Sequence, residues 1–355
     1  MTRKDVFIKE TSTLIEALKK LDKTAQKTLI VVDDKRRLMG TVTDGDIRRY
    51  IIKTGKLEGY VKDFYKKNPL FVTRKNLTQE KVKEILLKHK IELLPVVDEL
   101  NKVCDFITWV DVFGKDTKKV TGKNIEVPVV IMAGGKGTRL APFTQVLPKP
   151  LIPVGERTMI EYIIDNFRVF GVKKFYLTLN YKGELIEAYF KGSEKDYEVE
   201  FIWEEDYLGT AGSLKFLKGE LEGDFIVSNC DILLKTDFSE VLDFHKKNAS
   251  IFTSITAIQY YKIPYGVVNI KNGGIIADII EKPEYTFQIN TGVYVLNYKV
   301  LSYIPLNTYF DMPELVKVLL QKGEKVLAYP INEGDYIDMG QWEEYKEAFR
   351  KLSEL

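Results

Sequence analysis

Residues 129–154 constrain the fold more than any other part of the chain. Four apolar residues at positions 129–132 predict a β-strand buried on both faces. Ala133, Gly134, Gly135 and Gly137 follow directly. These residues allow a tight turn whose backbone N–H groups point into one concavity, and such a concavity binds anions. The stretch therefore indicates a strand that ends at a site for a polyanion such as a triphosphate.

Two basic residues in the same stretch support this interpretation. Arg139 offers a fixed fork of donors suited to phosphate oxygens, and Lys149 lies between Pro148 and Pro150, which hold the chain extended. The alternative is an ordinary glycine-rich turn with solvated basic residues. Neither the spacing of a dinucleotide fingerprint nor that of a Walker A loop is present.

This stretch resembles the signature of sugar-1-phosphate nucleotidyltransferases, which is Gly-Gly-x-Gly-x-Arg-Leu, then Pro and Thr, then Pro-Lys-Pro and Pro-Val. The matching residues are Gly134, Gly135, Gly137, Arg139, Leu140, Pro142, Thr144, Pro148, Lys149, Pro150, Pro153 and Val154. The resemblance implies that the turn binds a nucleotide. The residues it assigns to this role are Ala133, Gly134, Gly135, Gly137 and Thr138.

The resemblance continues to the end of the chain in the family's motif order. It assigns residues 208–214 to the nucleoside and glycosyl groups, with Gly209, Thr210, Ala211 and Gly212 as contacts. An apolar strand at 225–228 leads to Asp231, and residues 336–340 supply Asp338; both aspartates are candidate metal ligands. The sugar-phosphate residues implied by the remaining motifs are Gly266, Glu281, Lys282, Asn290 and Thr291.

The implied reaction explains these residue types. A sugar-1-phosphate oxygen attacks the α-phosphorus of a nucleoside triphosphate, and pyrophosphate leaves on the opposite side. The attacking phosphate needs no histidine base, which agrees with the position of His89 and His245 outside every motif. Two polyanions must meet, so positioning and charge neutralisation are the main requirements. Mg²⁺ is the expected cofactor, because one or two carboxylates together with phosphate oxygens satisfy it.

By the same resemblance, the catalytic residues are Arg139, Lys149 and Asp231. Arg139 would hold the β- and γ-phosphates, and Lys149 would stabilise charge on the α-phosphate. Lys282 would hold the sugar phosphate, and Glu281 would accept hydrogen bonds from sugar hydroxyls. Taken singly, each of these residues could equally be a solvated surface charge or a capping group.

The first third of the chain contains an internal repeat with an offset of 65 residues. The matched pairs are Leu29 with Leu94, Val31 with Val96, Val32 with Val97, Asp33 with Asp98, Val42 with Ile107, Thr43 with Thr108 and Asp46 with Asp111. Two copies predict a tandem domain pair rather than a solenoid. Each copy reads as helix, strand, turn, strand and helix.

Each second strand of the repeat ends in Thr-x-x-Asp, and the pair resembles CBS domains. In that family the threonine, here Thr43 or Thr108, typically meets a ligand phosphate, and the aspartate, here Asp46 or Asp111, meets ribose hydroxyls. A nucleotide is therefore a possible ligand of the pair. Read without the family, each aspartate is an N-cap at a strand-to-helix junction.

Composition bounds the remaining possibilities. The 355 residues exceed what one core usually holds, and 53 Lys and Arg against 51 Asp and Glu give no reason to invoke nucleic acid or an anionic membrane. We expect no membrane-spanning segment and no signal sequence, and hence a cytoplasmic protein. Cys104 and Cys230 lack metal-type or redox-type spacing and are expected to be reduced packing residues.

We therefore predict an α/β chain in two parts. Residues 1–115 form a tandem CBS pair of α+β type, with repeats at about 1–60 and 61–115. Residues 116–126 form a linker. Residues 127–355 form a Rossmann-like, doubly wound domain of GT-A-like type. The resemblance implies that residues 250–268 belong to a sugar-binding subsection with antiparallel strands.

The predicted function is Mg²⁺-dependent transfer of a nucleoside monophosphate to a sugar-1-phosphate. GTP with an amino-sugar phosphate such as glucosamine-1-phosphate is the first choice, by similarity to guanylyltransferases of legionaminic acid biosynthesis. Uridylyl or thymidylyl transfer, and a mannose- or heptose-1-phosphate acceptor, are alternatives. A catalytically silent nucleotide sensor and a glycosyltransferase are hypotheses from other classes. We expect a homo-oligomer, in which the CBS pair could regulate turnover.

Overall fold

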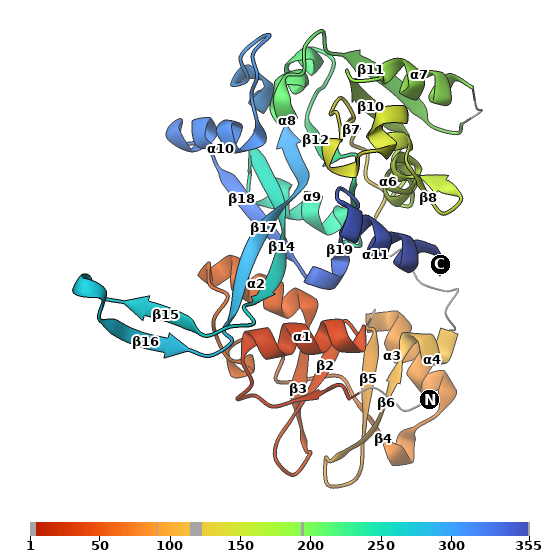
Figure 1. Ribbon diagram of the computed structural model, residues 1–355. Coiled ribbons are helices and arrows are strands. Elements are labelled where there is room, and N and C mark those ends of the chain that lie inside the picture. Colours follow the sequence, from red (N-terminus) through yellow and green to blue (C-terminus); the bar gives the residue numbers. More distant parts are fainter. Residues whose placement is uncertain (1–4, 90, 114–122, 193–194, 354–355) are drawn as a thin grey trace. The chain divides into compact units, whose positions relative to one another are not determined.

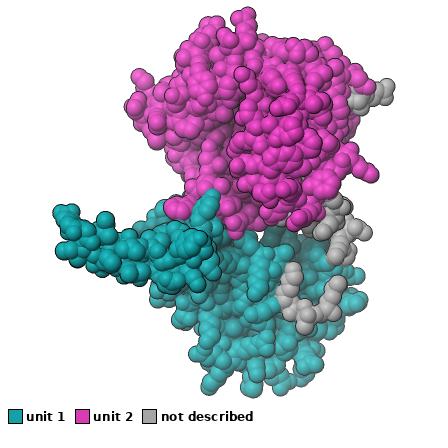
Figure 2. All heavy atoms as spheres, in the orientation of Figure 1, with its two compact units in different colours: residues 1–119, 260–286 teal, residues 120–259, 287–355 magenta. Residues whose placement is uncertain are grey.

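Two units make up the chain in the computed structural model, which describes residues 5–89, 91–113, 123–192 and 195–353 (Figure 2). Unit 1 comprises residues 1–119 and 260–286, and unit 2 comprises residues 120–259 and 287–355. Most of the predicted linker, 116–126, lies outside the described residues. Ile125, at its end, is buried in unit 2 and donates its N–H to the Phe170 carbonyl at 2.9 Å.

The 65-residue repeat of the sequence is also a repeat of secondary structure in unit 1 (Figure 1). The first copy contains β1 (Phe7–Ile8), α1 (Leu14–Thr24), β2 (Thr28–Val32), β3 (Leu38–Thr43) and α2 (Asp44–Thr54). The second copy contains β4 (Val72–Thr73), α3 (Gln79–His89), β5 (Leu93–Val97), β6 (Val103–Thr108) and α4 (Trp109–Phe113). The sheets have the orders β1-β2-β3 and β4-β5-β6. The short strands β1 and β4 are additions that the apolar pattern does not reveal.

Main-chain hydrogen bonds join the two copies at equivalent turns. The N–H of Leu38 donates to the carbonyl of Asn101 at 2.9 Å, and the N–H of Val103 donates to that of Arg36, also at 2.9 Å. Arg36 and Asn101 both have positive φ, 65° and 59°. The two bonds therefore join equivalent positions of the two copies, and the turns that form them have the same backbone conformation.

A β-hairpin from the second half of the chain belongs to unit 1. Its strands are β15 (Val267–Ile270) and β16 (Ile276–Ile280), which pair antiparallel. It continues from the end of β14 (Phe252–Lys262) and leads into β17 (Glu284–Asn297). At its base the Lys19 ammonium of α1 forms an ion pair with Glu284 and lies 5.1 Å from the centre of the Tyr260 ring.

Unit 2 is built on a seven-stranded sheet of order β11-β10-β7-β12-β17-β14-β18 (Figure 1). It includes β7 (Val129–Met132), β10 (Lys174–Leu179), β11 (Glu198–Trp203), β12 (Asp224–Asn229) and β18 (Val326–Ile331). Strands β11, β10, β7 and β12 run parallel to one another, and β17 pairs antiparallel with β12. The predicted strands and the α/β class are confirmed.

Alternate residues of β7 pack into two different cores. Val129 and Ile131 belong to one apolar cluster and Val130 to the other. This double burial is why the strand reads as a continuous apolar run. The helices whose side chains complete these clusters include α6 (Met159–Arg168), α7 (Gly183–Lys191), α9 (Phe238–Lys247) and α10 (Met312–Gln321).

One expectation about the sheet is correct only in part. The segment 250–268 was expected to belong to a subsection with antiparallel strands, but β14 is a strand of the main sheet and runs parallel to β18, whereas β15, which begins at the end of the segment, pairs antiparallel with β16. Strand β14 is buried on both sides, with Phe252, Thr253, Ile255 and Ala257 fully buried. No helix among the described residues is long and apolar enough to cross a membrane.

Candidate active site

The glycine-rich turn begins where β7 ends, as the sequence predicts. Ala133 donates its N–H to the carbonyl of Thr178 at 3.1 Å, which fixes the start of the turn to β10. Gly137 has a φ of 63°, and a methyl group there would lie 2.9 Å from the side chains of Lys149 and Thr144. Glycine is therefore required at 137 both by the backbone and by the close approach of Lys149.

Lys149 is buried, and its ammonium forms an ion pair with Asp231. It begins a short 3₁₀ turn, Lys149–Leu151, after Pro148 in an extended conformation. Asp231 follows β12 and is also buried. Two predicted catalytic residues, 82 positions apart in the sequence, thus meet directly.

Strand pairing brings the second predicted metal ligand to the same place. Strand β13 (Ile232–Leu234) pairs antiparallel with β19 (Tyr336–Asp338), and Asp338 lies opposite Ile232, the residue after Asp231. Both carboxylates and the Lys149 ammonium surround Gly340. A methyl group at Gly340 would lie 2.5 Å from Asp231 Oδ2, 2.8 Å from Asp338 Oδ1 and 3.1 Å from Lys149 Nζ.

The electrostatics of this cluster suit a divalent cation. Burial, followed by the charge of Asp231, raises the pKa of Asp338, although the N–H of Gly340 donates to its carboxylate at 2.6 Å. Two carboxylates held near one another in a buried setting are relieved by a cation between them. Among the described residues no three His, Cys, Asp or Glu side chains gather. The donor set therefore fits Mg²⁺ that takes its other ligands from phosphate and water.

A cavity of about 380 Å³ opens beside these carboxylates. Arg139, which is exposed, lies on its wall. The predicted site residues that line it are Arg139, Thr210, Asp231, Asn290, Thr291 and Asp338. The structure thus brings together phosphate-binding, metal-binding and sugar-side candidates from five separate motifs.

The loop 208–212 is fastened to residues 308–312, which the sequence did not reveal. Asp311 accepts from the N–H of Thr210 at 2.8 Å and from its hydroxyl at 3.0 Å. The N–H groups of Ala211 and Gly212 donate to the carbonyl of Phe310. The small residues of the loop 208–212 are therefore needed for its packing against residues 308–312, and not only to admit a ligand. A methyl group at Gly209 would lie 2.8 Å from Asp311 Oδ1.

Asn290 and Thr291 make internal hydrogen bonds while lining the cavity. The Asn290 amide donates to the hydroxyl of Tyr294 at 2.6 Å. The Thr291 hydroxyl is buried and donates to the carbonyl of Ile255 at 2.7 Å. The Oδ1 of Asn290 also accepts from the hydroxyl of Ser254 and from the N–H of Gly292, each at 3.2 Å. Both side chains are therefore held in place by the protein where they line the cavity.

The other sugar-side candidates lie together in unit 1, at the base of the hairpin. Gly266 precedes β15, and a methyl group there would lie 3.0 Å from Glu281 Oε2. Glu281 and Lys282 follow β16, with 3.9 Å between their charged groups, and both side chains are exposed. Gly266 therefore leaves room for the Glu281 carboxylate.

Glu204 is a buried carboxyl whose hydrogen bonds the sequence does not indicate. Its Oε2 accepts from the N–H of Leu208 at 2.9 Å, and a methyl group at Gly134 would lie 2.9 Å from its Oε1. Burial raises the pKa of Glu204. Its side chain lies close to the glycine-rich turn and holds the start of the loop 208–212 through the bond from Leu208. The sequence Trp-Glu-Glu at 203–205 does not by itself indicate which of the two glutamates is buried.

In the CBS pair, the candidate ligand residues form helix caps. Thr43, not Asp46, is the N-cap of α2, and Asp46 accepts from the N–H of Thr43 at 2.9 Å. Thr108 and Asp111 repeat the arrangement, with the corresponding bond at 2.8 Å. The expectation that each aspartate is the N-cap is therefore wrong by three positions, because Asp46 and Asp111 complete a capping box.

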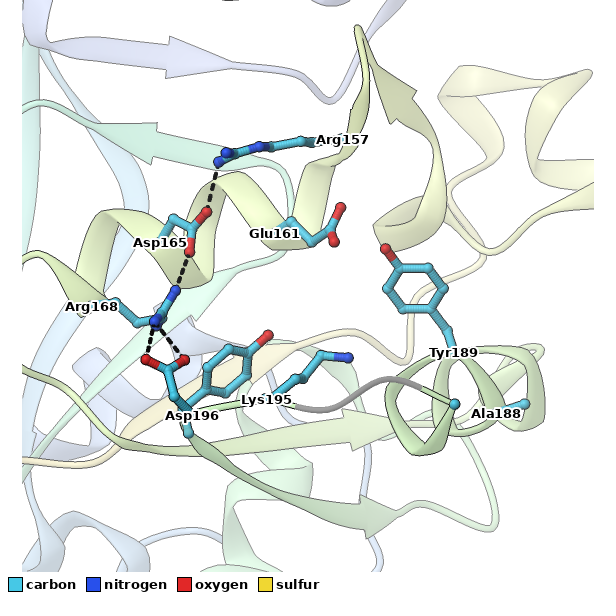
Figure 3. A pocket seen from close by; sticks show the side chains of 10 residues that line it. Arg157, Glu161, Asp165, Arg168, Ala188, Tyr189, Lys195 and Asp196 are labelled. Carbon is cyan, nitrogen blue, oxygen red and sulfur yellow. Dashed lines mark hydrogen bonds and ion pairs between the residues drawn. The ribbon is translucent and has the colours of Figure 1, made fainter.

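A larger hollow, of about 960 Å³, lies elsewhere in unit 2, between α6, α7 and residues 195–197 (Figure 3). Asp165 forms ion pairs with Arg157 and Arg168, each at 2.8 Å, and Arg168 also pairs with Asp196. Both arginines form ion pairs with aspartates, and no residue of the sequence motifs lines the hollow. The cavity beside Asp231 and Asp338 is therefore the better candidate for the phosphate site.

The histidines and cysteines lie outside the cavity. His245 is buried on α9, with its Nδ1 2.8 Å from the Thr253 hydroxyl and its Nε2 3.5 Å from Asp224. Burial raises the pKa of the Cys230 thiol to about 12, which agrees with a reduced packing residue. Cys104 is exposed, so its prediction as a packing residue is wrong.

Comparisons with known proteins agree with this geometry. The nucleotidyl transferase family matches residues 128–354, and the CBS domain matches residues 1–53 and 61–116. The mannose-1-phosphate guanyltransferase of Saccharomyces cerevisiae is 35% identical over 221 residues, 60% of this chain and 61% of that protein. The protein of the same name from Yarrowia lipolytica is 36% identical over 220 residues, 60% of each chain. The chain thus spans about 60% of the length of these relatives.

A solved structure supports the fold. It is a Bacillus anthracis protein provisionally assigned as a glucose-1-phosphate thymidylyltransferase, in complex with sucrose. The likeness has a TM-score of 0.51 at 20% identity and covers 64% of this chain and 96% of that one. The chain therefore belongs to the nucleotidyl transferase family and carries a pair of CBS domains in its first third.

Proposed function

We infer that the chain transfers a nucleoside monophosphate from a nucleoside triphosphate to a sugar-1-phosphate and releases pyrophosphate. The observation that carries this inference is the cluster of Lys149, Asp231 and Asp338 around Gly340, beside a cavity that Arg139 also lines. A cation for the α-phosphate, a pair of carboxylates for a metal and an exposed guanidinium are the groups that in-line phosphoryl transfer needs.

In this reaction a phosphate oxygen of the sugar-1-phosphate forms a bond to the α-phosphorus, and the bond to the bridging oxygen of the β-phosphate breaks. Pyrophosphate takes the bonding electrons. Arg139 binds the β- and γ-phosphates, and the Lys149 ammonium stabilises the charge on the α-phosphate. Asp231 and Asp338 would hold Mg²⁺, which when bound supplies charge neutralisation for the phosphates. No general base is required, because the attacking oxygen is already anionic.

GTP is the donor that we propose, and mannose-1-phosphate is the acceptor that the relatives favour. The curated relatives at 35% and 36% identity are mannose-1-phosphate guanyltransferases. Glucosamine-1-phosphate, the first choice from the sequence, stays a prediction, as do the cytoplasmic location and nucleotide regulation through the CBS pair. The base and the acceptor are separate questions, so the test must vary both.

The test incubates the purified chain and Mg²⁺ with each common nucleoside triphosphate and a set of acceptors: mannose-, glucosamine- and glucose-1-phosphate. Pyrophosphate release is measured, and the nucleotide sugar is identified by its mass. Release with GTP and mannose-1-phosphate supports the full proposal. Release with another pair corrects the base or the sugar. A nucleotide sugar consumed without pyrophosphate release would instead indicate a glycosyltransferase, and binding without turnover would indicate a sensor.

A further inference from the structure

Main-chain hydrogen bonds of Phe310 hold both ends of the loop 208–212. The N–H of Phe310 donates to the carbonyl of Leu208 at 2.9 Å, and its carbonyl accepts from the N–H of Gly212, also at 2.9 Å. Figure 1 shows the helical turn of this loop, α8 (Gly209–Gly212), beside α10. The ends of the loop are therefore fixed to the segment that leads into α10.

Asp311 holds the middle of the same loop through its carboxylate. Its Oδ1 accepts from the N–H of Thr210 at 2.8 Å and from the Thr210 hydroxyl at 3.0 Å. The Thr210 hydroxyl in turn accepts from the N–H of Met312 at 3.0 Å. This hydroxyl thus donates one hydrogen bond and accepts another within the protein, which indicates that Thr210 contributes to the site by fixing the loop.

The second oxygen of Asp311 is bonded as well. Its Oδ2 accepts from the hydroxyl of Tyr309 at 2.7 Å, and the centre of the Tyr309 ring lies 6.1 Å from that of Tyr207 in an edge-to-face arrangement. Burial raises the pKa of Asp311, but the hydrogen bonds from Thr210 and Tyr309 outweigh burial, so the pKa lies below its usual value. The carboxylate is therefore ionised at neutral pH, and its hydrogen bonds are stronger than bonds between neutral groups.

We propose that Asp311 is a positioning residue for the nucleoside triphosphate, and this inference rests on the proposed function. Asp311 and Thr210 line the same cavity as Arg139 and Asp231. Gly209 has a φ of 81°, and glycine loses more conformational freedom than any other residue when a loop becomes ordered. Because Asp311 holds the loop before the nucleotide arrives, binding does not incur that loss, and the nucleotide binds more tightly.

A purely structural role at the start of α10 is the alternative. Asp311 is the N-cap residue of α10, and its own N–H donates to the Glu314 carboxylate at 3.0 Å, which is the other half of a capping box. Glu314→Ala removes this half of the cap and leaves the bonds from Thr210 in place. It is therefore the matched control: Asp311→Ala and Glu314→Ala both weaken the start of α10, but only Asp311→Ala releases the loop.

The test begins without substrate, so that its first result does not depend on the proposed function. Amide hydrogen exchange of residues 209–213 should be faster in Asp311→Ala than in the original protein and in Glu314→Ala. Unchanged exchange in Asp311→Ala, or equally fast exchange in both variants, overturns the proposal, because the loop would then be held in another way.

Steady-state kinetics with Mg²⁺ and the substrate pair that the protein uses give the second result. In Asp311→Ala the KM for the triphosphate should rise about tenfold, whereas kcat and the KM for the sugar-1-phosphate should stay within about threefold of the original values. Asp311→Asn keeps an oxygen that can accept from Thr210, so it should recover most of this loss. A fall in kcat at an unchanged KM, or equal losses in Asp311→Asn and Asp311→Ala, overturns the positioning role.

Two further measurements keep the proposal open to refutation. If Asp311→Ala does not fold, Thr210→Val, which removes only the hydroxyl, should raise the KM for the triphosphate by about threefold; an unchanged KM contradicts the proposal. If no substrate pair is turned over, the proposed function fails, and calorimetric titration with GTP takes the place of the KM. A GTP affinity equal in Asp311→Ala and the original protein, or no binding to either, then overturns the positioning role as well.

Discussion

Replacement of Gly340 by alanine tests the geometry of the candidate active site directly. The added methyl group would lie 2.5 Å from Asp231 Oδ2 and 2.8 Å from Asp338 Oδ1, whereas ordinary contact begins at 3.4 Å. The first oxygen must therefore move by about 0.9 Å and the second by about 0.6 Å. Gly340 does not have a positive φ, so alanine brings no backbone strain and the change acts on the side chains.

The expected result is a large loss of turnover in a folded protein. Displacement of reacting groups by about 1 Å can cost about 100-fold in rate, which corresponds to about 2.7 kcal/mol of activation free energy. Overpacking should also lower the free energy of unfolding, by about 1 kcal/mol or slightly more. The assay is steady-state pyrophosphate release with GTP and the best acceptor, together with thermal unfolding followed by circular dichroism.

Gly192→Ala is the matched control for this variant. Gly192 ends α7 with φ −82° and ψ 0°, and its added methyl group meets only the carbonyls of Ala188 at 3.3 Å and Tyr189 at 3.9 Å. Its turnover should equal that of the original protein. If Gly340→Ala keeps kcat/KM within about threefold of that value, the carboxylates do not act from the positions described, and the reasoning fails.

Three further changes test separate parts of the structure. Asp231→Asn should keep the fold and remove most turnover, since it removes one charge of the carboxylate pair at nearly constant volume; near-normal activity at saturating Mg²⁺ would exclude Asp231 as a metal ligand. Glu204→Gln should change how stability depends on pH. Because burial raises the pKa of Glu204 above 4.5, the folded chain holds this proton more tightly than the unfolded chain, so the stability it contributes is present at low pH and lost as pH rises through the raised value. Denaturant unfolding at a series of pH values should show this loss in the original protein and not in the variant, and parallel curves would contradict it. Asp46→Ala removes the bond to the N–H of Thr43 and should lower the free energy of unfolding of the CBS pair by about 1 kcal/mol; an unchanged melting temperature would show that the capping box does not contribute.

Local patterns in the sequence predicted most elements of the fold. Strand β7 is apolar at every position because it packs into two cores, and the turn after it contains glycine where Lys149 approaches. The repeat offset of 65 residues predicted the paired module because each copy keeps the same strands and helices. Each of these features produces a pattern in residues that are close together in the sequence or repeated at a fixed offset, so it can be recognised in a single sequence.

Contacts between distant segments could not be predicted in this way. Asp311 fastens Thr210 across 101 positions, and no spacing rule links the two residues. The hydrogen bond of Glu204 to Leu208 could not be assigned from the sequence either, because burial of one carboxyl depends on how β11 and the loop 208–212 pack. The placement of β14 in the main sheet could not be predicted, because Thr and Ile favour strands in general and do not indicate which sheet a strand joins.

The turns that join the two CBS repeats also bear on how the module arose. The paired bonds between Leu38 and Asn101, and between Val103 and Arg36, are related by the same offset as the sequence. Each repeat supplies one donor N–H and one acceptor carbonyl to this pair of bonds. A chain that held only one repeat could therefore form both bonds by pairing with a second molecule. The present arrangement is what a duplicated and fused ancestral dimer would leave, with its two-fold axis now inside a single polypeptide.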